Sequence, residues 1–154
     1  MSIYLVASLI GVVAGLRAMT APAATSWAAH LGWLPLQTTS LAFLGSSVAV
    51  AILTVLAMVE LVTDQLPKTP SRKVPVQFGV RLVSGGFCGA AIGLAGGAMI
   101  GGLIAGVIGT VIGTLGGAEG RGRLAAAWGK DLPAALAEDV VAVGGAALIL
   151  AAFA

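Results

Sequence analysis

Charged residues are scarce in this chain: Asp, Glu, Lys and Arg make up 9% of its 154 residues, whereas a soluble domain carries ~25%. Several uncharged runs are long enough to cross a membrane, so the composition excludes a soluble globular domain and indicates a polytopic membrane protein. The polar connections are too short to fold alone, and we expect one integral-membrane domain over residues 1–154. The formal net charge of +2 does not indicate nucleic-acid binding, because the basic residues lie in the predicted loops.

Cysteine and histidine are almost absent, with one residue of each. An internal disulfide is therefore excluded, and Cys88, inside an apolar run, is expected to be a small core residue. His30 has no Cys, Asp or Glu near it in sequence, so we expect a polar interfacial residue rather than a metal ligand. No Ser-His-Asp set, Cys-His pair or phosphate-binding loop can be assembled. We therefore expect no enzyme activity, no cofactor and no metal ion.

Glycine, by contrast, is abundant, with 23 residues. In the central stretch Gly85, Gly89, Gly93, Gly97, Gly101, Gly109, Gly113 and Gly117 recur at every fourth position, and Ala105 fills the one gap. Small residues four apart let helices approach to backbone contact, so these positions predict helix packing of the glycine-zipper kind. One helix of this length would span ~50 Å, against a hydrocarbon core of ~30 Å. The stretch must therefore break, and the pair Gly96-Gly97 is the expected place.

The predicted fold class is all-α, with about five membrane spans. These spans cover about residues 3–19, 41–63, 76–95, 98–118 and 133–153. Pro22 is expected to end the first span, because proline disfavours helix at the residue before it. The segment between the first two spans carries Trp27 and Trp33, which suits an interfacial helix or a re-entrant segment.

The basic residues predict the topology. Lys68, Arg72 and Lys73 follow the second span, and Arg121, Arg123 and Lys130 follow the fourth. With five spans both basic loops face one side, which should be the cytoplasm, so the N-terminus is expected inside and the C-terminus outside. Residues 28–35 can also be aligned with residues 126–133, at an offset of three spans. That offset is the pattern of an inverted repeat, which is typical of transporters, or of a chance similarity.

A group of charged residues falls within or beside the predicted spans. Glu60, Asp64, Arg81, Glu138 and Asp139 are all expected in the cytoplasmic third of the membrane. Charges at such depth normally face protein or water and are paired. They predict either an ion-pair network that joins the spans or a site for a cation, a proton or the polar end of a substrate. Arg17, near the end of the first span, is either a snorkelling anchor or a residue that holds an anion at a broken helix end.

Three motifs carry a resemblance to a known family. They are Gly15-Leu16-Arg17-Ala18, the segment from Glu60 to Pro67 with acids at Glu60 and Asp64, and Leu132-Pro133-Ala134-Ala135-Leu136-Ala137-Glu138-Asp139. With these motifs the chain resembles a family of small bacterial integral-membrane proteins of unknown function. The resemblance covers most of the chain and implies a bacterial inner-membrane setting. It implies no established activity.

We expect a small membrane transporter or channel-like permease for a small solute or ion, coupled to protons or cations and working as a homo-oligomer in membrane lipid. The basis is the set of intramembrane charges, the broken Gly-rich spans and the repeat pattern. The alternative is a non-transporting scaffold or accessory subunit that binds a partner through its Gly-rich helix faces. A cavity that reaches Glu60 or Arg17 would favour transport, and a dry, fully paired cluster would favour the scaffold.

Overall fold

The computed structural model describes residues 2–63 and 75–153. Within these ranges the chain is all-helical and contains no strand. The helices are α1 (Ile3–Leu16), α2 (Thr20–His30), the 3-10 helix η1 (Ala42–Gly45), α3 (Ser47–Thr63), α4 (Pro75–Ala95), α5 (Met99–Trp128) and α6 (Asp131–Phe153). Asp64, Lys68, Arg72 and Lys73 lie outside the described residues.

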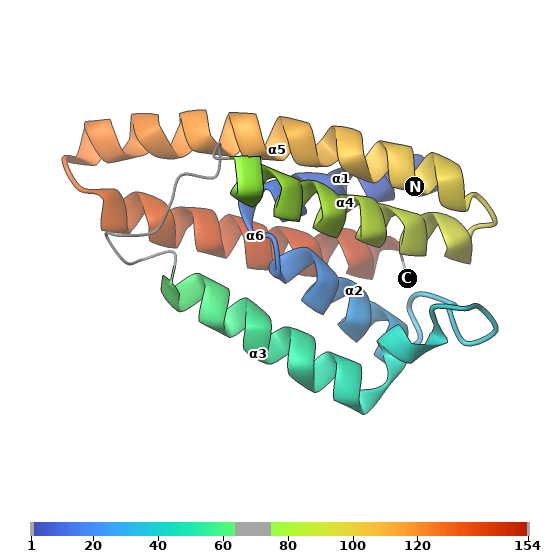
Figure 1. Ribbon diagram of the computed structural model, residues 1–154. Coiled ribbons are helices and arrows are strands. Elements are labelled where there is room, and N and C mark those ends of the chain that lie inside the picture. Colours follow the sequence, from blue (N-terminus) through green and yellow to red (C-terminus); the bar gives the residue numbers. More distant parts are fainter. Residues whose placement is uncertain (1, 64–74, 154) are drawn as a thin grey trace.

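The six α-helices run back and forth along one common direction (Figure 1). Figure 1 shows α5 along one side of the bundle and α3 along the other, with α1, α2, α4 and α6 between them. Both termini lie at the same end, whereas five spans would place them on opposite sides of a membrane. The end of α3 and the α5–α6 turn lie toward the other end, and α4 begins nearer the middle of the bundle.

Three helices are long and apolar enough to cross a membrane, namely Pro75–Ala95, Met99–Trp128 and residues Leu132–Phe153 of α6. The helices Ile3–Leu16 and Ser47–Thr63 are apolar but shorter. These features suggest a membrane-embedded protein. They do not confirm the count of five spans.

The first predicted span, residues 3–19, is shorter in the structure, because α1 ends at Leu16. Arg17 has an extended backbone, with φ −143° and ψ 111°. The chain then forms α2, which returns toward the end of the bundle where α1 began (Figure 1). Pro22 therefore does not end a span but lies in the first turn of α2, where a missing N–H costs no helical hydrogen bond. A straight helix continuous through Ala18 is disfavoured, since the proline ring would clash with the carbonyl four residues before it.

The α4–α5 turn lies at Gly96 and Gly97, where the length argument predicts it. Gly97 has φ +77°, which is easy only for glycine. Helix α5 is longer than the predicted span 98–118, because the polar segment after it is helical through Trp128. The ion pair Arg123–Glu119, at 2.9 Å and four residues apart, supports this extension. Gly129, with φ +70°, ends it in the left-handed conformation usual after helices.

Close backbone contacts between α4 and α5 involve glycines of both helices. A Cβ atom added to Gly89 would lie 2.3 Å from the carbonyl oxygen of Gly102, and one added to Gly93 would lie 2.9 Å from the Cα of Gly102. One added to Gly85 would lie 3.2 Å from the carbonyl oxygen of Gly106. The α5 partners of α4 are thus Gly102 and Gly106, which the four-residue pattern does not include.

A second glycine face of α5 contacts α1. Cβ atoms added to Gly109 and Gly113 would lie 2.0 Å and 2.2 Å from the carbonyl oxygens of Ser8 and Val12. One added to Gly101 would lie 2.5 Å from the ring of Tyr4. Gly97 differs from these positions, because it lies in the turn with open space around it. Helix α5 therefore packs closely against two helices, and Gly106 contacts both, since a Cβ added to Gly11 of α1 would lie 2.2 Å from its carbonyl oxygen.

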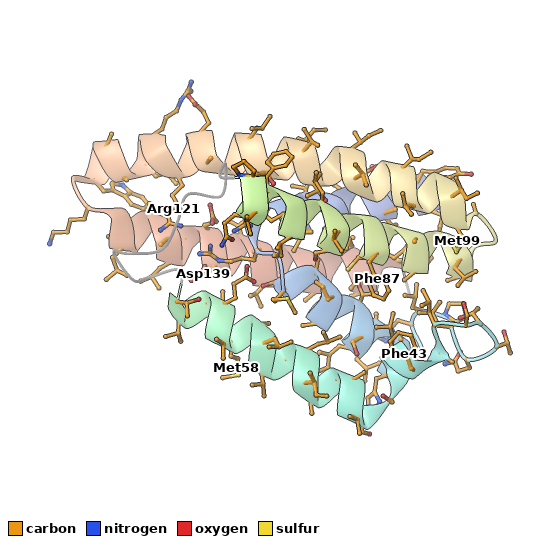
Figure 2. The ribbon with its side chains drawn as sticks, viewed as in Figure 1. Phe43, Met58, Phe87, Met99, Arg121 and Asp139 are labelled. Carbon is orange, nitrogen blue, oxygen red and sulfur yellow. The ribbon has the colours of Figure 1, made fainter. Side chains whose placement is uncertain are left out.

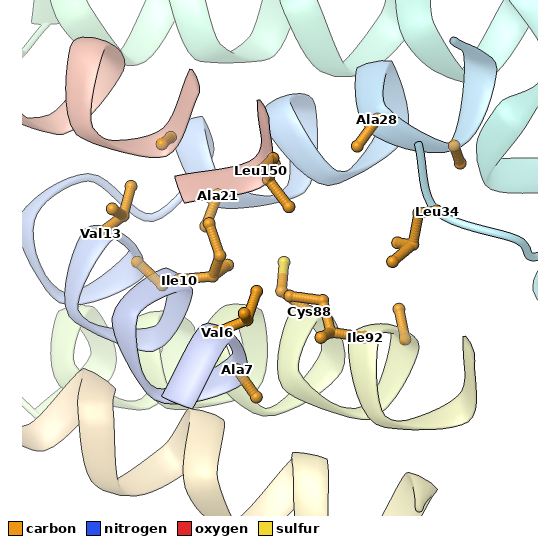
Figure 3. Packing of buried hydrophobic residues seen from close by; sticks show 14 of the residues in the cluster. Val6, Ala7, Ile10, Val13, Ala21, Ala28, Leu34, Cys88, Ile92 and Leu150 are labelled. Carbon is orange, nitrogen blue, oxygen red and sulfur yellow. The ribbon is translucent and has the colours of Figure 1, made fainter. Parts of the chain in front are cut away.

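The apolar core lies between α1, α2, α4 and α6 (Figure 3). Val6 and Ile10 of α1, Cys88 and Ile92 of α4 and Leu150 of α6 are at most 2% exposed. Helix α3 is less embedded, and among its residues only Val50 and Ala57 are buried. Cys88 is thus a small core residue, as its apolar surroundings in the sequence predict.

Candidate functional site

The polar centre of the protein is the break between α1 and α2. Arg17 occupies the break and its residue is 0% exposed. Because the guanidinium group does not reach solvent, the snorkelling interpretation of Arg17 is wrong. Inside a bundle, the charge of an arginine is costly unless acids or carbonyl groups surround it.

Two neighbouring acids of α6 hold Arg17. Its Nε donates a hydrogen bond to Oδ1 of Asp139 at 2.6 Å, and Nη2 contacts the same carboxylate oxygen. Its Nη1 lies 3.1 Å from Oε1 of Glu138. The same oxygen of Glu138 lies 4.0 Å from Nη1 of Arg121, which comes from α5. Figure 2 shows Arg121 and Asp139 at this level of the bundle.

The free helix ends at the break are met by charged side chains from two other helices. Glu60 of α3 accepts hydrogen bonds from the backbone N–H groups of Ala18 at 2.8 Å and Met19 at 2.7 Å, just before α2 begins. An anion is favoured there, since unbonded N–H groups and the helix dipole both attract negative charge. At the end of α1, Nη1 of Arg81 donates to the carbonyl oxygen of Gly15 at 2.9 Å. A cation is favoured at a helix C-terminus for the same reason.

The structure thus brings together five of the six predicted site residues, and each of the five contacts a defined partner. Arg17 pairs with Glu138 and Asp139 across the α1–α6 contact, while Glu60 and Arg81 bind backbone groups on either side of the break. The sixth residue, Asp64, lies outside the described residues.

Two further side chains belong to this site. The hydroxyl of Ser84 donates to the carbonyl oxygen of Ala18 within the break. Ser84 lies three residues after Arg81, so the rule that such residues share a helix face could have identified it. Arg121 reaches Glu138 only because its segment is helical, whereas the sequence predicts a loop there.

A cavity lies beside this cluster, and neither Arg17 nor Glu60 is among the residues that line it. It has a volume of about 210 Å³ and lies between α5 and α6, with Arg121 and Glu138 among its lining residues. Leu16, the last residue of α1, also lines it. The carboxylate of Glu138 therefore lies between this cavity and the guanidinium of Arg17.

The last turns of α2 and the segment that follows it lie at the opposite end of the bundle. Trp27 donates from Nε1 to the hydroxyl of Thr54 at 2.9 Å, and His30 donates from Nδ1 to the carbonyl oxygen of Gly45 at the same distance. These bonds tie α2 to α3 and to η1. They lie at the end of α2 that is away from the Arg17 cluster (Figure 1).

Comparison with known proteins identifies the family but no activity. No curated protein and no solved structure matches the chain. One family model, described as a domain of unknown function, matches residues 4–153 and so includes every element of the fold and the whole charged cluster. The chain therefore belongs to the DUF4126 family.

Proposed function

We propose that the protein is a small membrane transporter or channel-like permease for a small solute or ion, with its site at the α1–α2 break. The observation that carries this proposal is the buried break itself, whose two helix ends are held by Glu60 and Arg81. A continuous helix would be the simpler way to satisfy backbone groups in lipid. Interrupted helices whose ends meet charged groups near the middle of the membrane are typical of transporters.

Coupling to protons or cations follows from the position of Glu138. Glu138 is among the residues that line the α5–α6 cavity, and its carboxylate is shared between Arg17 and Arg121. A proton or cation that enters the cavity would neutralise Glu138 and weaken its attraction to Arg17. Arg17 would keep Asp139 as a partner, so the exchange would not leave a buried charge without a counter-ion.

The proposed setting is the bacterial inner membrane, with the end that carries Arg121, Arg123 and Lys130 in the cytoplasm. The sequence alone predicts five spans. An odd number of spans places the two termini on opposite sides, with the N-terminus inside and the C-terminus outside. Since α2 returns toward the start of α1, we propose instead that both termini lie at the outer end.

The second candidate is a non-transporting scaffold or accessory subunit. It is favoured by the complete burial of Arg17 and its direct pairing with two acids, which would hold α1 and α6 together. The glycine contacts described above lie within one chain, so a partner or a second copy would have to use another surface. The exposed apolar side of α3, with Ile52 and Val59, is the candidate for that surface.

Flux through proteoliposomes separates the two functions. The purified protein is reconstituted with a pH-sensitive dye inside, and proton, sodium, potassium and chloride gradients are applied in turn. Transport predicts flux above that of protein-free vesicles and a decrease of about tenfold or more in Glu138→Gln. The matched control is Glu119→Gln, which makes the same change on an exposed ion pair and should transport like the wild type.

The scaffold predicts the opposite pattern. No gradient would produce flux in the wild type, and Glu138→Gln would lower only the melting temperature. That result would refute transport of these ions by the protein.

A further inference from the structure

An apolar cavity lies between α2, α3 and α6. Two threonines help to line it: the hydroxyl of Thr54 accepts a hydrogen bond from Trp27, and the hydroxyl of Thr20 is buried with no such bond among the described residues. The cavity has a volume of about 380 Å³, within the range of about 300–1,000 Å³ found for ligand pockets. Its lining residues include Thr20 and Leu31 of α2, Met58 of α3 and Leu150 of α6, and Figure 2 shows Met58 on α3. Along α2 the lining runs from Thr20 to Leu31, a rise of about 16 Å, so the cavity is elongated.

Thr20 is the unusual residue of this cavity. It is 6% exposed, and none of the described residues forms a hydrogen bond with its Oγ1. Helical threonines usually donate to the carbonyl four residues earlier, as Thr25 does to Ala21 and Thr110 to Gly106, each at 2.8 Å. The corresponding residue for Thr20 is Leu16, which belongs to α1 on the other side of the break. The broken helix therefore leaves this hydroxyl without its usual acceptor.

A buried hydroxyl without a partner costs free energy, so a ligand group that bonds to it would gain affinity. No charged side chain is among the described residues that line the cavity, which disfavours an ionic ligand. The carboxylate of Glu60 binds the backbone N–H groups of Ala18 and Met19, just before Thr20. Its negative charge would repel an anionic ligand.

We propose that this cavity binds an uncharged, chain-like apolar molecule with a single hydrogen-bonding group, such as a medium-chain alcohol, whose polar end bonds to Thr20 and whose chain extends toward Leu31. The site is separate from the Arg17 cluster. It does not depend on whether the protein transports ions.

The test uses a photoreactive decanol with a diazirine at the end of the chain far from the hydroxyl. The full-length protein in nanodiscs is labelled, and the adducts are mapped by peptide mass spectrometry. Labelling should be saturable, should occur near Leu31 and Leu150, and should be displaced by decanol at least about fivefold more effectively than by decane, since one hydrogen bond is worth about that factor.

Three variants test the role of the hydroxyl. Thr20→Val should weaken decanol binding about fivefold, and Thr20→Ser, which keeps the hydroxyl, should bind like the wild type. Thr114→Val is the matched control, because Thr114 also has a buried hydroxyl with no bond to a described residue and is not among the residues that line this cavity. It should not change binding.

Two results would overturn the proposal. One is labelling that does not saturate and that spreads equally over the exposed α5 residues Ile104, Ile108 and Ile112, which would mean contact with bulk lipid only. The other is equal displacement by decane and decanol, or unchanged decanol affinity in Thr20→Val, which would mean that the hydroxyl takes no part. If Thr20→Val does not fold, the decane comparison and Thr20→Ser still decide the question.

Discussion

Adding one methyl group at Gly109 tests whether α1 and α5 are in backbone contact. In Gly109→Ala the new Cβ would lie 2.0 Å from the carbonyl oxygen of Ser8 and 2.8 Å from its carbonyl carbon. Both neighbours are backbone atoms of α1, so no side-chain rotation can relieve the contact. The control is Gly144→Ala in α6, since a Cβ at Gly144 meets nothing within 4 Å.

The expected free-energy change follows from this geometry. Real Cβ contacts essentially never fall below 3.0 Å, so α1 would have to move by about 1 Å in an interior too closely packed to absorb it. Overpacking of this kind costs ~1–3 kcal/mol and occasionally more. Replacing glycine by alanine inside a helix gains up to ~1 kcal/mol. Gly109→Ala should therefore lower the free energy of unfolding by ~1–3 kcal/mol, while Gly144→Ala should leave it unchanged or raise it by up to ~1 kcal/mol.

The measurement is thermal unfolding in detergent, followed by circular dichroism, with gel filtration to check assembly. Gly93→Leu and Gly109→Leu should disturb folding further, whereas Leu103→Ala, at a half-exposed position, should have a small effect. Equal melting temperatures for Gly109→Ala and Gly144→Ala would refute the reasoning, because they would mean that α5 does not approach α1 as closely as the structure shows.

Four other outcomes are expected. Arg81→Met should lower stability by ~1.5–3 kcal/mol in thermal unfolding, because the carbonyl oxygen of Gly15 loses a charged donor, while Arg123→Met on an exposed pair should change it little. Glu60→Gln should cost ~1–3 kcal/mol in the same assay, since a glutamine amide has one acceptor oxygen for two backbone N–H groups; an unchanged melting temperature would contradict this. Cys88 should react with a maleimide only after unfolding in SDS, because it is 0% exposed, and labelling of the folded protein would show an open core. Reporter fusions at the two termini should indicate the same side of the membrane, and opposite sides would contradict the arrangement in Figure 1.

The membrane class and the broken Gly-rich stretch could be predicted from the sequence, because both depend on local quantities. Charge content and run length determine which solvent a segment prefers. A helix from Gly85 to Gly117 would be longer than the hydrocarbon core, so a break was required, and the pair Gly96-Gly97 near the middle of the stretch was the expected place. The candidate site residues could also be chosen, since few charges lie inside the apolar runs.

Other elements could not be predicted from local patterns. The direction of α2 depends on the break at Arg17, and the break persists because Glu60 and Arg81 hold its backbone ends from distant helices. The extension of α5 to Trp128 depends on weak helix preferences and on one ion pair. The polar composition of this segment is equally typical of a loop, so it does not indicate the helix. The return of α2 changes the number of crossings that we propose, and no local pattern in the sequence indicates it.

What the sequence determined by itself is therefore the apolar character of each segment and the set of charged residues that need partners within it. The tertiary structure decided the pairing: Arg17 with Glu138 and Asp139, Glu60 and Arg81 with backbone groups, and Gly102 and Gly106 with α4. The physical reason is that a buried charge or a small-residue face requires some partner, while many partners satisfy the same requirement. Which one is present depends on how the helices pack in three dimensions, and no local pattern in the chain contains that information.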